Sequence, residues 1–151
     1  MSAAAQNLVA NPSFEDVLDV NCLWCDAQNT IGYYLTGWDS PNQGSPDMHS
    51  LLVSDTCWSY ASGSTYNDTI TCQPGGQIPR TGNVMAGLIT YRDSSDWREY
   101  LQNELLEPMI PGKLYRVQLY VSLADNSGFS SNNLGVYFSK ESEFSAESGV
   151  F

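Results

Sequence analysis

The sequence predicts an all-β domain of the sandwich type, and its strongest support is strict alternation along residues 113–123. Every second side chain there is apolar, and these side chains share one face: Tyr115, Val117, Leu119, Val121 and Leu123. Because successive side chains of a strand point to opposite sides, this alternation is typical of a half-buried β-strand. Pro111 and Gly112 come just before it and suit a type II turn, so residues 98–106 are expected to be the antiparallel partner. The third observation is a series of roughly seven short apolar segments separated by turns, as in a sandwich.

These short strands are expected, in chain order, at 8–9, 33–38, 51–53, 83–91, 98–106, 113–123 and 134–138. Asn11-Pro12 turns the chain after the first strand, and Phe14 is expected to point back into apolar surroundings. Residues 39–82 are rich in Gly and Pro, and so long a connection is usually functional or held by a disulfide. Residues 98–106 also fit helical spacing, but the tight turn that follows them favours a hairpin strand.

Length and composition indicate one globular domain. The chain has 151 residues, of which 42% are hydrophobic and 12% aromatic, and this suffices for a core. We expect residues 1–6 to be a tag or signal remnant and residues 7–151 to form a single β-sandwich domain. No strong closing strand is visible. The open sheet edge would therefore be supplied by residues 143–151, by C-terminal strands missing from this chain, or by another chain.

The charge balance excludes several classes of partner. Six basic and 17 acidic residues give a net charge of −11. Nucleic acids and anionic membranes both need clustered Lys and Arg, so neither is an expected partner. No apolar run approaches the roughly 20 residues of a membrane helix, and no signal peptide is visible. The acidity suits the solubility of a secreted or cell-surface protein, and cation binding is the other interpretation.

The four cysteines suit an oxidising compartment, where an even number forms disulfides: Cys22, Cys25, Cys57 and Cys72. Three pairings are possible, and we favour pairing between chain neighbours, Cys22 with Cys25 and Cys57 with Cys72. The second bridge would stabilise the fold by about 3 kcal/mol, because it lowers the conformational entropy of the unfolded chain. Structural zinc is disfavoured, because only one cysteine pair is closely spaced and the single histidine, His49, is expected in a loop.

Several short motifs follow one another in order: Asn7-Leu-Val-Ala-Asn-Pro-Ser-Phe-Glu15, Gly37-Trp38, Arg98-Glu-Tyr-Leu101, Pro111-Gly-Lys-Leu-Tyr115, Val121-Ser-Leu-Ala-Asp125 and Leu134-Gly-Val-Tyr-Phe-Ser139. The ordered set resembles the N-terminal domains of secreted or surface proteins of Bacteroidetes-type bacteria, which are often exported by the type IX route. It is similar, more distantly, to jelly-roll carbohydrate-binding modules of the galactose-binding-like superfold. The resemblance implies a jelly-roll β-sandwich that is incomplete at its C-terminus. In related modules the opening Glu and a late Asp hold a structural calcium ion, and only Glu15 matches here.

No catalytic set is visible in the sequence, so we expect no enzyme. A Ser-His-Asp arrangement would have to use His49, and the chain has no Gly-x-Ser-x-Gly nucleophile motif. A glycosidase needs two placed carboxylates, and a count of acidic residues does not show placement.

The stretch 55–70 has the composition of a recognition loop, and its candidate ligand-binding residues are Trp58, Tyr60, Tyr66, Asp55 and Asn67. Aromatic faces stack on the apolar faces of sugars, and amides and carboxylates bind sugar hydroxyls. The other interpretation is that these rings pack around the bridge between Cys57 and Cys72. The sequence thus predicts a non-catalytic extracellular module that binds a glycan or another cell-surface ligand. The alternative is a structural or adhesion module of a surface or filament protein, with a protein partner.

Overall fold

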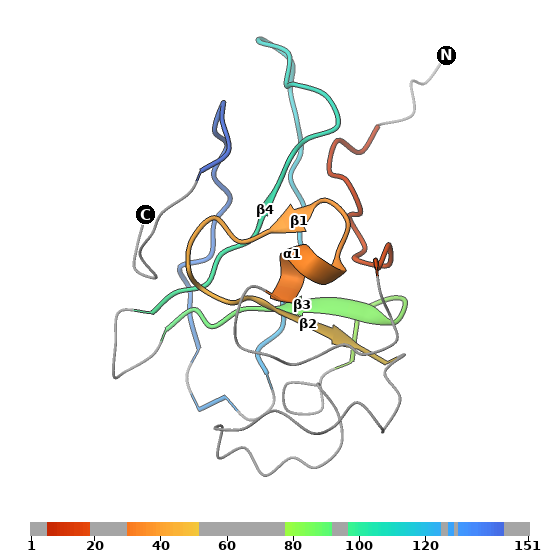
Figure 1. Ribbon diagram of the computed structural model, residues 1–151. Coiled ribbons are helices and arrows are strands. Elements are labelled where there is room, and N and C mark those ends of the chain that lie inside the picture. The colour runs from red at the N-terminus through yellow and green to blue at the C-terminus, as the bar shows by residue number, and fades with distance from the viewer. Residues whose placement is uncertain are drawn as a thin grey trace.

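A computed structural model describes residues 6–18, 30–51, 78–91, 97–124, 127–128 and 130–143. Its elements are α1 (Thr30–Tyr34), β1 (Trp38–Asp39), β2 (Asp47–Ser50), β3 (Val84–Gly87) and β4 (Gln102–Asn103). The strands form two antiparallel pairs, β1 with β4 and β2 with β3. Figure 1 shows α1 between the two pairs, and the helix contacts both β1 and β2. The described chain is thus mostly non-helical with short antiparallel strands, which agrees with the all-β expectation at this coarse level.

The two strand pairs are nested along the chain. Trp38 lies opposite Asn103 in the outer pair, and Ser50 lies opposite Val84 in the inner pair. Two isolated β-bridges lie outside these strands. One joins Val9 to Leu105, and the other joins Val17 to Leu35. The fold is therefore held by contacts between segments far apart in the sequence.

The core of the described residues lies where α1 meets the inner strand pair. It consists of four fully or nearly buried side chains, Ile31, Leu35, Met48 and Val84. Ile31 and Leu35 are four residues apart, and this spacing puts both side chains over one side of the helical turn. Burying each of these side chains contributes roughly 1.5–3 kcal/mol. Further apolar residues pack partly buried against them: Phe14, Val17, Tyr34, Trp38, Ala86 and Leu101.

The N-terminal turn forms as predicted. The backbone N–H of Phe14 donates to the carbonyl oxygen of Asn11 at 3.1 Å, and both residues have positive φ, 64° and 43°. Phe14 points back into the molecule and packs on Trp38, with ring centroids 4.8 Å apart. The Asn11 side chain then bridges two segments, since its Nδ2 donates to the carbonyl oxygens of Asp16 at 3.0 Å and Thr36 at 3.1 Å.

The turn at Pro111 and Gly112 is also confirmed. Gly112 has a φ of 80°, and the Lys113 N–H donates to the Ile110 carbonyl oxygen at 3.2 Å, which closes the turn. In Figure 1 the chain runs from β4 out to this turn and returns.

The strand expected after this turn is the main correction to the sequence analysis. Residues 113–123 carry no strand and are exposed on both sides, with Leu114 fully exposed. Their expected partner is extended, but it pairs elsewhere: β4 pairs with β1, and Leu105 pairs with Val9. The alternation indicates that the segment is amphipathic. It does not indicate which other segment pairs with residues 113–123.

Three other elements differ from expectation. The strand expected over residues 33–38 begins only at Trp38, because α1 occupies Thr30–Tyr34. Of the strand expected over 51–53, only Leu51 is described, and it follows β2 in a turn; residues 52–53 lie outside the described residues. Residues 134–138 carry no strand. Within the described ranges, no helix has the length and apolar character to cross a membrane.

Candidate functional site

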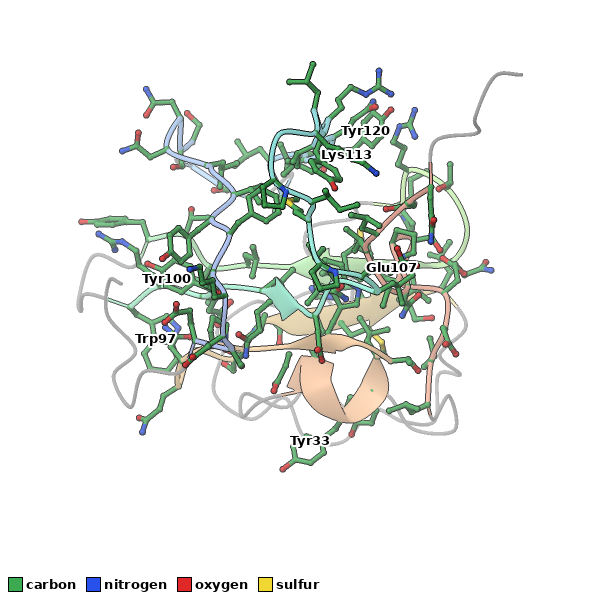
Figure 2. All side chains as sticks on the ribbon, turned by 90° about the horizontal axis from the view of Figure 1, so that it is seen from above. Tyr33, Trp97, Tyr100, Glu107, Lys113 and Tyr120 are labelled. Atoms are coloured by element: carbon green, nitrogen blue, oxygen red, sulfur yellow. The ribbon has the colours of Figure 1, made fainter. Side chains whose placement is uncertain are left out.

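A half-open cavity of about 390 Å³ lies beside α1. Eight residues from separate parts of the chain line it: Gly32, Tyr33, Asp39, Ser40, Asn42, Gln102, Ser142 and Glu143. The Tyr33 side chain is 72% exposed, and Figure 2 shows it projecting from α1 at the rim of the molecule. The cavity thus combines an exposed aromatic ring with carboxylate, amide and hydroxyl groups.

The outer strand pair brings the polar groups of this cavity together. Asp39 on β1 lies directly opposite Gln102 on β4. The Asp39 Oδ1 accepts a hydrogen bond from the Ser40 N–H at 2.7 Å, and the Ser142 hydroxyl donates to the Gln102 Oε1 at 3.4 Å. Gly32 leaves room for this arrangement, since a Cβ there would lie 2.6 Å from the Asp39 Oδ1.

The loop between β1 and β2 forms a rigid wall of the cavity. The buried Ser40 hydroxyl donates to the carbonyl oxygens of Asn42 and Gly44, at 3.0 and 2.9 Å. The Asn42 side chain accepts from the Gly44 N–H and donates to the Arg98 carbonyl oxygen, both at 3.0 Å. A Cβ at position 44 would lie 2.8 Å from that same Arg98 oxygen. The loop therefore packs closely on the segment leading into β4, and buried networks of this kind rigidify a structure when they are satisfied.

A buried carboxyl group, Glu99, and a partly buried one, Asp47, lie next to this wall. The Glu99 carboxylate accepts from the Ile89 N–H at 2.7 Å, the Ser45 hydroxyl at 3.3 Å and the Trp97 indole N–H at 3.3 Å. Burial raises the pKa of Glu99, against the lowering effect of these hydrogen bonds. Burial, and then the charge of Glu99, raises the pKa of Asp47 to about 7.

This carboxyl pair is better suited to a structural role than to catalysis. A carboxyl group with a pKa near 7 has the proton affinity of a general acid or base. However, Glu99 is buried, and neither carboxyl group lines the cavity. His49, expected in a loop, lies instead on β2 and is buried, with its ring against Gly87. The three side chains belong to the interior that supports the cavity wall.

Glu15, the candidate calcium ligand, holds the start of β3. Its Oε1 accepts the backbone N–H groups of Asn83 and Val84, each at 2.9 Å. Within the described ranges, no group of three or more His, Cys, Asp or Glu side chains is placed to share a metal ion. A calcium role for Glu15 remains a prediction.

The other residues singled out in the sequence lie outside the described residues. They are the candidate sugar-binding residues Asp55, Trp58, Tyr60, Tyr66 and Asn67 and the cysteines Cys22, Cys25, Cys57 and Cys72. Sequence reasoning missed the cavity residues Tyr33, Asp39 and Gln102. Their one signal was the cluster of turn-forming residues after Trp38, which places polar groups beside a strand end.

No family model, no curated protein and no solved structure matches this chain. Function is therefore inferred from the chemistry of the site itself.

Proposed function

We propose that this chain is a non-catalytic, secreted or cell-surface module that binds carbohydrate. The cavity beside Tyr33 is the observation that supports the proposal. Its lining offers the donors and acceptors that sugar hydroxyls require, from Asp39, Gln102 and Glu143. The exposed Tyr33 ring supplies a flat surface for the apolar face of a sugar, with little loss of side-chain entropy on binding.

We also propose the fold. The order of the sequence motifs supports a jelly-roll sandwich related to the surface domains of Bacteroidetes-type bacteria. The antiparallel pairing of every described strand and the turn at Pro111 and Gly112 support this. Fold analogy does not by itself assign a function, so the binding site has to be tested directly.

The test is a glycan array followed by calorimetry with the best oligosaccharide. Tyr33→Ala should weaken binding by about tenfold or more, because the stacking surface is lost. Gln102→Ala should weaken it as well by removing an amide at the cavity. Tyr137→Ala is the matched control, since Tyr137 is 80% exposed and does not line the cavity.

Trp58→Ala tests the loop that the sequence singled out. A loss of binding in this variant together with normal binding in Tyr33→Ala would move the site from the cavity to residues 55–70. No binding to any glycan on the array would reject the proposed function. Unfolding midpoints in calcium and in EGTA test Glu15, because a structural calcium ion raises the midpoint by mass action.

A structural or adhesion module with a protein partner is the second candidate. Exposed apolar side chains along residues 113–123 and 134–138 favour it, because large apolar patches mark sites of protein interaction. The two functions are compatible in one domain, since a module can bind sugar at one place and assemble through another.

A further inference from the structure

Residues 113–123 form an amphipathic segment whose apolar face is exposed. The five side chains of its apolar face are 40–66% exposed, and they are Tyr115, Val117, Leu119, Val121 and Leu123. No backbone-to-backbone hydrogen bond joins residues 114–121 to another described residue. An extended segment with open backbone groups is a template for pairing with a further strand.

The charge of this segment sets it apart from the rest of the chain. Residues 108–124 contain no Asp or Glu, while the whole chain has 17. The segment carries Lys113 and Arg116, and the Arg80 guanidinium carbon lies 3.5 Å from the ring centroid of Tyr120. Three of the six basic residues thus gather on or against it. Two copies of a chain with net charge −11 would meet here with the least repulsion.

The segment is also complementary to itself. If two copies pair antiparallel about a two-fold axis at Leu119, then Val117 lies opposite Val121 and Tyr115 lies opposite Leu123. Each apolar side chain of one copy then faces an apolar side chain of the other. On the opposite face Arg116 lies across from Ser122, so no like charges are opposed. Cross-strand apolar and aromatic pairs of this kind stabilise a sheet, and opposed like charges destabilise it.

We propose that two copies of this chain associate through residues 113–123, which pair as antiparallel β-strands about an axis at Leu119. The pairing gives the segment the strand conformation that its alternation encodes. It forms a two-stranded sheet across the two copies, and it sets the five apolar side chains of one copy beside those of the other, which covers part of their exposed surface. A two-fold interface is the commonest arrangement of homo-oligomers, and it requires such self-complementarity.

Cysteine crosslinking tests the register directly. Leu119→Cys should form a covalent dimer under mild oxidation, because the two thiols meet at the axis. Val117→Cys and Val121→Cys should each form no more dimer than the unaltered chain. An equimolar mixture of these two variants should crosslink, since residue 117 of one copy faces residue 121 of the other. Each product is checked on a non-reducing gel, and the linked peptides are identified by mass spectrometry.

Tyr33→Cys, without glycan present, is the control for random collision, because Tyr33 is 72% exposed and lies on the opposite side of the molecule from Lys113 and Tyr120. The proposal is overturned if Leu119→Cys gives no more dimer than this control. It is also overturned if all three single variants of the segment crosslink equally. In Figure 2, Lys113 and Tyr120 lie on the opposite side of the molecule from Tyr33. Sugar binding and dimerisation can therefore fail independently of each other.

Discussion

At the scale of single residues, Glu15 and Gly82 together define the start of β3. The Glu15 carboxylate binds two backbone N–H groups there, and Gly82 lies against that carboxylate with a φ of 70°. Only glycine adopts such a φ without strain, and a Cβ at this position would collide with the Glu15 carboxylate. The carboxylate can reach the two amides because position 82 has no side chain.

We expect Gly82→Ala to lower the free energy of unfolding by about 1–3 kcal/mol, through backbone strain and loss of the Glu15 hydrogen bonds. Chemical denaturation measures the change. Gly135→Ala is the control, because a Cβ there meets nothing within 4 Å. Equal effects of the two substitutions would contradict this account of β3.

Asn42 has a comparable role in the cavity wall. It is 1% exposed, and its side chain joins Gly44 to the segment before β4. Asn42→Ala should lower the free energy of unfolding by about 1–3 kcal/mol, because it leaves buried polar groups without their partner. The substitution should also lower the affinity of the cavity for sugar.

The neighbouring Gln43 provides the control for this experiment, because its side chain is exposed. Gln43→Ala should change the denaturation midpoint very little. If Asn42→Ala is equally mild, then the wall is not held by this network.

At the scale of elements, the start of β2 carries a carboxyl group that is costly to ionise. The pKa of Asp47 is raised from 3.8 to about 7 by burial and then by Glu99. Between these two values the folded chain holds a proton that the unfolded chain releases. The free energy of unfolding therefore falls as pH rises from about 4 to about 7.

Asp47→Asn should weaken this pH dependence, to which Glu99 still contributes, and raise stability at pH 8 by roughly 1–4 kcal/mol. Thermal unfolding over pH 4–8 measures it, with the exposed Asp16→Asn as control. A variant that is no more stable than the unaltered chain at pH 8 would show that Asp47 ionises without cost.

Sequence reasoning succeeded at this scale where the signal is local. The turns at Asn11 and at Gly112 depend on residues that tolerate positive φ, and both are present. β3 lies within its expected range of 83–91 for the same reason, since alternation along a short segment is also a local signal. By contrast, α1 has only five residues, too few for helical periodicity to show.

Pairing and the cavity could not be predicted, because both depend on distant segments. Asp39 and Gln102 meet only through the register of β1 with β4. Neither residue carries a signal of the other in its own neighbourhood. Alternation over residues 113–123 predicted a strand paired with residues 98–106, whereas the segment carries no strand and β4 pairs with β1.

At the scale of the whole molecule, a net charge of −11 opposes any association between copies. Salt should therefore strengthen the proposed dimer, since the Debye length falls from about 30 Å at 0.01 M to about 10 Å at 0.1 M ionic strength. Sedimentation velocity at both salt concentrations measures the dimer fraction. A dimer that weakens with salt would instead pair the basic residues of one copy with acidic residues of the other.

The nested strand pairs have a consequence for which changes in chain length this domain can accept. The chain leaves β2 at Ser50 and re-enters β3 at Val84, and these two residues are direct partners. The connection between these two strands therefore begins and ends at the same end of one strand pair. Doubling the length of a flexible connection costs only about 0.6 kcal/mol in closure entropy. Foreign sequences could be grafted there to give one scaffold many different specificities.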